Sequence, residues 1–243
     1  KEVFVSPNLV DDEEINLRDT CRALAGNLDK YIIDNTVVAV SWGNTLNCLA
    51  GQIQPLKAKD IKVVQLNGGV AKSASSTGAS QIVDALTMAG HGIGYMFPVP
   101  AIVDSKHTSE ILQEETQVKN VLRLAKEAEV SIFSIGALSK DSILYEVEYL
   151  KDEDFQALEK NKAVGDIASR YFDINGNIAL KELDDRVVGF GLEELREKEW
   201  TIAIAVGVNK VDAIIGALRA GFMNVLYTDE KTAREILNRN LLG

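Results

Sequence analysis

Four apolar runs in this sequence end in glycine, with polar residues close behind. The runs end at Gly43, at the pair Gly68 and Gly69, at Gly136 and at Gly207. In a parallel sheet such strand ends share one edge, and ligands of open α/β sheets bind at that edge. The glycines therefore predict a ligand pocket, although any one of them is equally typical of an ordinary strand-to-helix turn.

The first of these turns carries residue types that bind anions. Gly43 is followed by Asn44, Thr45 and a helical pattern. The free N–H groups at the start of a helix attract negative charge, and the two polar side chains add donors. Lys210 comes three residues after Gly207, where its ammonium could pair with phosphate. The alternative for Lys210 is a solvated side chain at a helix start.

Other polar residues near the strand ends suit the hydroxyl groups of a sugar. Asn67 offers an amide, Thr77 a hydroxyl and Asp166 a carboxylate, and all three types exchange hydrogen bonds with hydroxyls. Asp166 could instead cap a helix. Taken together with Lys210, these groups predict a small polyhydroxylated anion as the ligand.

Alternating strands and helices position these residues. Apolar runs predict strands at 3–6, 36–41, 61–66, 130–136, 201–207 and 224–228, with an extended segment at 95–100. Helical patterns cover 12–32, 44–54, 76–90, 107–127, 152–161, 165–171, 193–198, 210–220 and 229–240. Residues 172–178 contain Asn-Gly, which predicts a hairpin.

This order predicts an α/β fold with a doubly wound, mostly parallel sheet. Strands that are apolar on both faces require helices on both sides, so the architecture is Rossmann-like with one small hairpin insertion. The 243 residues contain no repeat or linker and fit a single domain.

Composition excludes several classes of protein. A formal net charge of −10 argues against direct binding of nucleic acid by this segment. No apolar stretch is long enough to span a bilayer, and the start lacks the features of a signal peptide, so we expect a cytoplasmic protein. Cys21 and Cys48 lack metal or redox spacing and suggest reduced core residues. His91 and His107 have no metal-ligand spacing, so neither a metal nor a cofactor is expected.

Five motifs in order resemble the effector-binding domain of SorC-family bacterial transcriptional regulators, close to the deoxyribonucleoside and central glycolytic regulator type. They are Ser-Trp-Gly-Asn-Thr at 41–45, Val-Val-Gln-Leu-Asn-Gly-Gly at 63–69, Ala-Val-Gly-Asp-Ile at 163–167, Phe-Asp-x-Asn-Gly at 172–176 and Ala-Val-Gly-Val-Asn-Lys-Val-Asp-Ala-Ile at 205–214. The resemblance covers nearly the whole chain. It implies a fold like that of sugar-phosphate isomerases, a sugar phosphate effector, homodimers or homotetramers, and DNA binding through an N-terminal helix-turn-helix that these residues do not include.

The resemblance also implies roles for individual residues. Gly43, Asn44, Thr45 and Lys210 would hold the phosphate, and Asn67, Gly68, Gly69 and Asp166 would face the sugar. Thr77 and Gly136 complete the predicted ligand-binding set by their place near the strand ends.

One departure from the family bears on the chemistry. Some relatives have a lysine just before the Gly-Gly pair and form an imine with an aldehyde sugar, and others have an arginine there for a second phosphate. This chain has Asn67 at that position, which excludes a covalent adduct at this residue and favours a sugar monophosphate held without one.

A sensor is therefore the leading interpretation, and a sugar-phosphate isomerase or deaminase on the same fold is the alternative. An isomerase needs a positioned carboxylate base, and the Asp-Gly-Ala-Asp motif of those enzymes is absent from the sequence. A sugar-binding transport protein is a weaker third possibility, which the missing signal peptide opposes.

Overall fold

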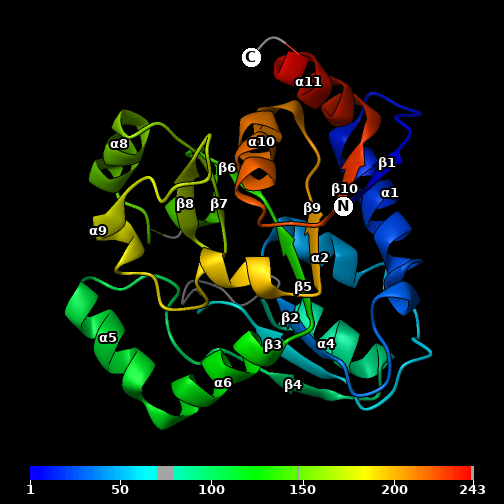
Figure 1. Cartoon of the computed structure of the whole chain (residues 1–243), viewed down its shortest axis with the longest axis horizontal. Coiled ribbons are helices and arrows are strands. Elements are labelled where there is room, and N and C mark those ends of the chain that lie inside the picture. Colours follow the sequence, from blue (N-terminus) through cyan, green and yellow to red (C-terminus); the bar gives the residue numbers. More distant parts are fainter. Residues whose placement is uncertain (70–78, 147, 242–243) are drawn as a thin grey trace.

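A seven-stranded parallel sheet forms the centre of the molecule (Figure 1). The computed structural model describes residues 1–69, 79–146 and 148–241. From one edge to the other, the strands are β1 (Glu2–Ser6), β10 (Val225–Asp229), β9 (Trp200–Ile204), β5 (Val130–Ser134), β2 (Val37–Val40), β3 (Lys62–Gln65) and β4 (Ile93–Tyr95). Every pairing is parallel, so the predicted fold class is confirmed.

Helices cover both faces of this sheet. One face packs against α1 (Glu13–Ala25), α2 (Asn44–Ala50) and α4 (Ala79–Ala89), and the other against α6 (Thr116–Glu127), α10 (Val211–Ala220) and α11 (Glu230–Leu241). Successive strand residues point to opposite faces: Val38 and Val40 belong to the first core, and Ala39 to the second. This is why central strands such as β2 are apolar on both faces rather than alternating.

A smaller antiparallel sheet stands beside the carboxyl ends of the large one. It contains β6 (Gly136–Ala137), β7 (Ala163–Ile167) and β8 (Arg170–Asp173). The remaining described helices are α5 (Lys106–Glu114), α7 (Ile143–Glu146), α8 (Asp152–Lys160), α9 (Lys181–Asp184) and the 3-10 turns η1 (Leu28–Lys30), η2 (Leu192–Glu197) and η3 (Val208–Lys210). None of the helices in the described ranges is long and apolar enough to cross a membrane.

The predicted helix at 165–171 is wrong. These residues form parts of β7 and β8, with a two-residue turn in which Ala168 (φ 51°) and Ser169 (φ 69°) are left-handed. Such turns favour Asn and Gly, so Ala-Ser gives no turn signal in the sequence. The predicted Asn-Gly turn does form, with Gly176 at φ 81° and an antiparallel bridge between Phe172 and Ile178.

Two long helices predicted from the sequence are shorter in the structure. The helix at 12–32 begins as expected, because the side chain of Asp12 accepts from Ile15 N, but it ends at Ala25. The helix at 107–127 is divided into α5 and α6 by Glu115, which has extended backbone angles. The extended segment at 95–100 begins earlier, as β4. Cys21 and Cys48 are free thiols, and Cys21 is buried.

Candidate functional site

A concave site lies where the direction of the sheet's connections reverses. From β2 the chain continues outward to β3 and β4, then returns to β5 on the other side of β2 and continues to β9 and β10. Helices leave opposite faces at such a point, and a crevice opens at the carboxyl ends of the strands. The crevice encloses about 400 Å³. Among its lining residues are Glu13, Ser41, Trp42, Gly43, Asn44, Thr45, Asn67, Ser134, Gly136, Ser139, Asp141, Ser142, Asp166, Ser169, Asn209 and Lys210.

One end of the pocket is built by the turn from β2 into α2. Gly43 has φ 131° and ψ 176°, a conformation that side-chain-bearing residues rarely adopt, and it directly precedes the first turn of the helix. The first N–H groups of that turn have no acceptor within the helix. Thr45 is buried and Asn44 is exposed beside it. This end therefore presents hydrogen-bond donors.

Lys210 adds a positive charge to the pocket. The turn at Gly207 (φ 117°) after β9 leads into η3, of which Lys210 is the last residue. Burial lowers the pKa of the Lys210 ammonium below its usual value, and the charges of Glu13 and Asp166 oppose this shift. Among the described residues, no hydrogen bond or ion pair within 4 Å engages this ammonium. It is therefore available to an anion.

Asp166 also lines the pocket, on β7, where it pairs with Gly136 of β6. A Cβ atom on Gly136 would lie 2.2 Å from Asp166 Oδ1, so the carboxylate fits only because residue 136 is glycine. Asp166 Oδ2 accepts a hydrogen bond from Ser169 N (3.1 Å). Burial raises the pKa of Asp166 to about 6, against the opposing effects of the Ser169 N–H and Lys210.

Asn67 follows β3 and is 2% exposed. Its Nδ2 donates to Ser169 Oγ (3.0 Å), while Oδ1 has no partner among the described residues. Its backbone forms an antiparallel bridge with Gly189.

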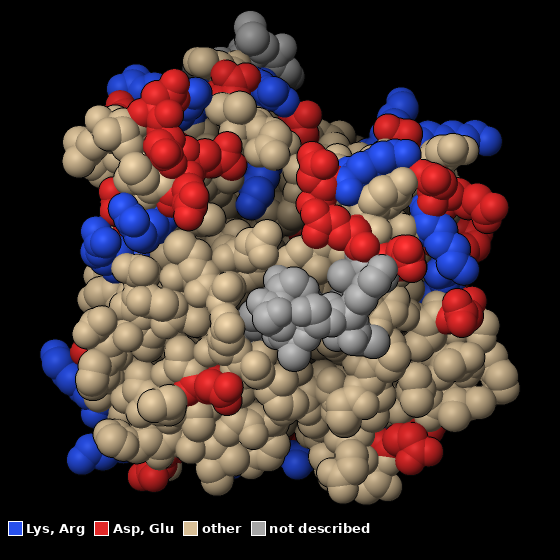
Figure 2. Space-filling view, turned by 180° about the vertical axis from the view of Figure 1, so that it is seen from behind, with Lys and Arg blue, Asp and Glu red and all other residues tan. Residues whose placement is uncertain are grey.

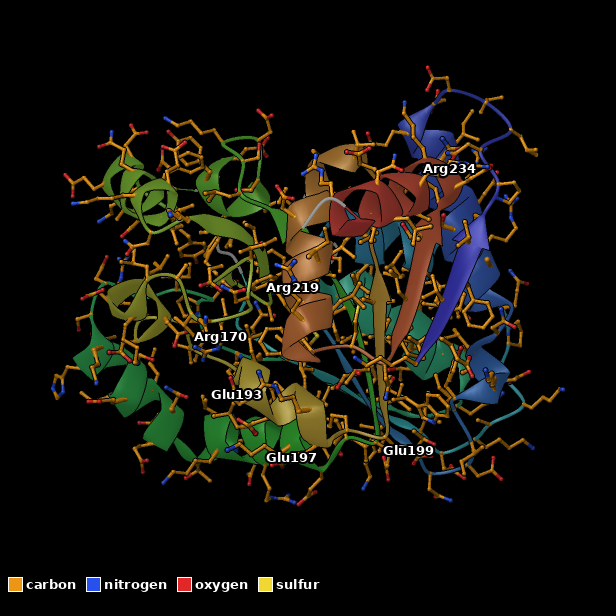
Figure 3. All side chains as sticks on the ribbon, turned by 45° about the horizontal axis from the view of Figure 1, so that its top comes forward. Arg170, Glu193, Glu197, Glu199, Arg219 and Arg234 are labelled. Atoms are coloured by element: carbon orange, nitrogen blue, oxygen red, sulfur yellow. The ribbon has the colours of Figure 1, made fainter. Side chains whose placement is uncertain are left out.

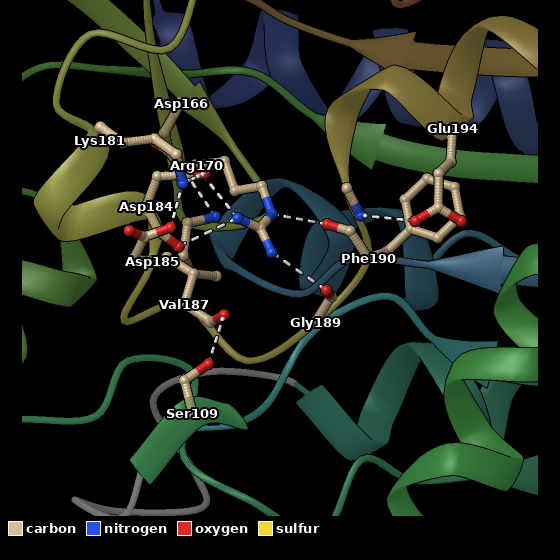
Figure 4. A network of polar contacts seen from close by, with 12 residues as sticks. Ser109, Asp166, Arg170, Lys181, Asp184, Asp185, Val187, Gly189, Phe190 and Glu194 are labelled. Atoms are coloured by element: carbon tan, nitrogen blue, oxygen red, sulfur yellow. Dashed lines mark hydrogen bonds and ion pairs between the residues drawn. The ribbon is translucent and has the colours of Figure 1, made fainter. Parts of the chain in front are cut away.

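A buried arginine holds the segment that supports Asn67 (Figure 4). Arg170 Nε donates to Phe190 O (2.7 Å), a second nitrogen donates to Gly189 O (3.1 Å), and a third pairs with Asp184 Oδ1 (2.6 Å). Figure 3 shows Arg170 inside the molecule, whereas Glu193 lies on η2. The arginine thus fixes residues 184–190 against the wall of the pocket.

The structure brings most of the predicted site residues together. Gly43, Asn44, Thr45, Asn67, Gly136, Asp166 and Lys210 all line the pocket. Gly68 and Gly69 do not line it, and their N–H groups donate to Val188 O and Val99 O. Gly68 has a packing role, because a Cβ there would lie 2.4 Å from Pro100 O. Thr77 lies outside the described residues.

Sequence reasoning missed several polar residues of the pocket. Ser169 was assigned to a helix, and the wrong element concealed its position beside Asn67. Glu13 belongs to α1, at the far end of the sequence from η3, and no local pattern connects the two. Ser134 is the last residue of β5, and Ser139 and Ser142 follow it; the number of serines in this stretch was the available signal.

Comparison with known proteins identifies the family. Residues 1–238 match the family model described as "Putative sugar-binding domain". The deoxyribonucleoside regulator of Bacillus subtilis (strain 168) is 33% identical over 220 residues, which are 90% of this chain and 70% of that protein. The transcriptional regulator LsrR of Escherichia coli (strain K12) is 31% identical over 208 residues, 83% of this chain and 62% of that protein.

Solved structures of regulators share the fold. A DeoR family transcriptional regulator from Listeria monocytogenes has a TM-score of 0.88 at 27% identity, covering 96% of this chain and 92% of that one. A transcriptional regulator from Streptococcus pneumoniae TIGR4 has a TM-score of 0.91 at 26% identity, covering 98% and 92%. The full-length sorbitol operon regulator SorC from Klebsiella pneumoniae, 22% identical, shows the same fold with a TM-score of 0.89 over 98% of this chain and 76% of that one.

These relatives are transcriptional regulators and not enzymes, so the role of this chain is ligand sensing rather than catalysis, and the isomerase alternative is not supported. The chain belongs to the family of sugar-binding domains found in SorC- and DeoR-type transcriptional regulators.

Proposed function

We propose that this chain is an effector-binding domain that binds a phosphorylated sugar without a covalent bond and thereby alters the oligomerisation and DNA binding of a full-length regulator. The observation that carries the proposal is the chemistry of the pocket lining. It combines the start of a helix and a partly buried ammonium without a described partner with the acceptor groups of Asp166 and Asn67.

The hydrogen-bond donors of the pocket lining suit a phosphate. The first turn of α2 offers N–H groups, Thr45 adds a hydroxyl, and Lys210 adds a charge that no described residue pairs. A buried cation without a partner is unfavourable, so an anion that neutralises it gains more than it would at a solvated lysine.

The acceptors of the pocket lining suit a sugar. Asp166 and Asn67 line the pocket and carry oxygens that can accept hydrogen bonds from the hydroxyl groups of a sugar. Lys210 is the one lysine among the described residues of the lining, and we assign it to the phosphate rather than to an imine. Binding without a covalent bond follows from that assignment.

A thermal-shift screen of matched sugar pairs tests the proposal. A ligand that binds the native state raises the unfolding temperature by mass action. We expect sugar phosphates to raise it and their unphosphorylated counterparts to raise it far less, with calorimetry giving the dissociation constants. Equal shifts for both members of every pair, or no shift with any sugar phosphate, would reject the proposal.

The regulatory part of the proposal concerns other surfaces. On the face in Figure 2, acidic and basic side chains lie mainly over the upper part and form no continuous basic surface. Together with the net charge of −10, this supports assigning DNA contact to a separate module of a cytoplasmic full-length protein. Met88, Ile93 and Met96, near the edge strand β4, are 79%, 60% and 42% exposed, and they offer an apolar surface to a second copy of the chain. A ligand that binds one assembly better would shift the population of the regulator.

A further inference from the structure

The two cysteines of the chain lie beside each other between two helices. Cys21 is on α1 and Cys48 on α2, and both belong to the core that packs these helices against the sheet. Cys21 Sγ donates to the carbonyl oxygen of Thr45 at 3.7 Å. Cys48 follows Thr45 by three residues on the same side of α2, and its Cβ tilts back toward that turn. The two thiols are therefore neighbours, although their spacing in the sequence gives no sign of it.

The two thiols differ in exposure and in acidity. Cys21 is 0% exposed, whereas Cys48 is partly exposed. Hydrogen bonding with Cys21 lowers the pKa of Cys48 to about 7, with help from the charge of Arg18 and against the opposing effects of burial and Glu14. The same hydrogen bonding and burial raise the pKa of Cys21, which keeps its proton. An accessible thiolate next to a second, protonated thiol is the arrangement found in redox-sensing cysteine pairs.

We infer that Cys48 is a site of reversible oxidation by peroxides, and that Cys21 converts the oxidised form into an intramolecular disulfide between α1 and α2. The Cys48 sulfur attacks one oxygen of hydrogen peroxide, the O–O bond breaks and hydroxide leaves, so the sulfur is oxidised to a sulfenic acid and the peroxide is reduced. The Cys21 sulfur then attacks the sulfenic sulfur. An S–S bond forms, the S–O bond breaks, and the leaving hydroxide takes the Cys21 proton as water.

The position of the pair connects this oxidation to the pocket. Thr45 lines the pocket, and the Cys21 thiol donates to its carbonyl. A disulfide has no S–H and holds its sulfurs about 2.0 Å apart, so its formation removes that hydrogen bond and draws α2 toward α1. The inference goes beyond the proposed function, because the oxidation itself needs no ligand. Under the proposed function, the oxidised chain should bind a sugar phosphate about tenfold more weakly, because the donors at the start of α2 are displaced from the phosphate.

Counting thiols in the full chain tests the inference. The chain has two cysteines, so hydrogen peroxide should reduce the number of free thiols, titrated after unfolding, from two to none. The mass of the single chain should fall by two hydrogen atoms, and dithiothreitol should restore both thiols. Survival of both thiols, disulfides only between chains, or oxidation of Cys48 that ends at sulfinic acid without a disulfide would overturn the inference.

Variants assign the two roles. In Cys21→Ala, oxidation of Cys48 should stop at the sulfenic acid, which dimedone traps, whereas the wild type should give little adduct. Cys48→Ser should leave Cys21 reduced at the same peroxide concentration, because that thiol is buried and protonated. Loss of the Cys21 thiol in Cys48→Ser at the wild-type rate would overturn the assignment of Cys48 as the reactive thiol. Circular dichroism confirms that each variant is folded, and Cys48→Ser keeps the test decisive if Cys21→Ala does not fold.

Calorimetry on the same samples tests the connection to the pocket. Ribose 5-phosphate, glucose 6-phosphate and fructose 6-phosphate are titrated into the reduced and the oxidised chain. Weaker binding to the oxidised chain, restored by dithiothreitol, would support the connection, and equal binding to both forms would overturn it. Failure of all three to bind the reduced chain would count against the proposed function alone, because the thiol count does not depend on a ligand.

Discussion

Under the proposed function, binding of a phosphate depends most on Lys210. Lys210→Ala should weaken a phosphorylated ligand by on the order of 1.5–3 kcal/mol, because a charge-assisted hydrogen bond is lost. The unphosphorylated analogue should bind nearly as before. Calorimetry with both ligands measures the difference.

Lys198 provides the matched control for this prediction. Its Nζ donates to Ala125 O (2.9 Å) at the end of α6, and it does not line the pocket. Lys198→Ala should therefore change stability without changing the ratio of the two affinities. Equal losses for both ligands in Lys210→Ala would reject the assignment of Lys210 to the phosphate.

The Asp166 carboxylate lowers the free energy of unfolding at neutral pH. Burial raises the pKa of Asp166 to about 6, whereas an unfolded Asp titrates near pH 3.9. A raised pKa contributes stability that is present below about pH 4 and lost as the pH rises through 6. Asp166→Asn should then exceed the wild-type free energy of unfolding by on the order of 2 kcal/mol at pH 7.5, and this gain should disappear near pH 4.

Urea unfolding at the two pH values checks the sign. Asp185 is the opposite case, because hydrogen bonds from Lys181 and Lys106 lower the pKa of its carboxyl. Asp185→Asn should be less stable than the wild type at neutral pH, with the deficit disappearing in acid. A pH-independent effect of Asp166→Asn would contradict the assignment of the shift to burial.

At the scale of elements, the contact between β6 and β7 positions the Asp166 carboxylate in the pocket lining. Gly136→Ala places a Cβ 2.2 Å from Asp166 Oδ1 and should displace the carboxylate. We expect a loss of about 1–3 kcal/mol in unfolding free energy and weaker ligand binding. Gly69→Ala is the control, since no atom of the described residues lies within 4 Å of its added Cβ. Equal effects of the two changes, measured by denaturation and calorimetry, would show that the carboxylate does not depend on Gly136.

The buried ion pair of Arg170 ties β8 to the 184–190 segment. Arg170→Met leaves the Asp184 carboxylate and three backbone carbonyls without their partner and should lower the unfolding free energy by about 3–5 kcal/mol. Arg123 forms an exposed pair with Glu127 four residues away, and Arg123→Met should cost less than about 1 kcal/mol. Similar losses for both variants in urea denaturation would show that burial of the pair does not matter.

The elements differ in how far the sequence predicts them. Runs such as 201–207 are apolar throughout, so their strands and the layered fold follow from the pattern alone. The hairpin at 163–173 does not, because Ala168 and Ser169 take left-handed angles under tertiary constraint rather than by their own preference. Most of the predicted pocket residues lie at strand ends, where the topology of the sheet brings them together. Ser169 could not be predicted as a pocket residue, because its position is set by that hairpin.

For the molecule as a whole, we expect no DNA binding by these 243 residues and assembly into a dimer or tetramer. The net charge of −10 opposes contact with phosphate backbones, and the exposed apolar residues near β4 favour self-association. Light scattering and a DNA mobility-shift assay, with and without the ligand found by screening, check both statements. A monomer in both conditions would refute the assembly, and tight DNA binding would reveal a basic surface that the net charge hides.

The order of the strands has a consequence for the newly made protein. β1 pairs within the sheet only with β10, so Glu2 finds its neighbour at Val225, and Glu13 of the pocket lies on the helix that follows β1. A ribosome adds about 5–20 residues per second, so these early residues wait roughly 10–45 s for their partner. A growing chain therefore completes this pairing only after β10 has been synthesised, and under the proposed function we expect full effector binding only from that point.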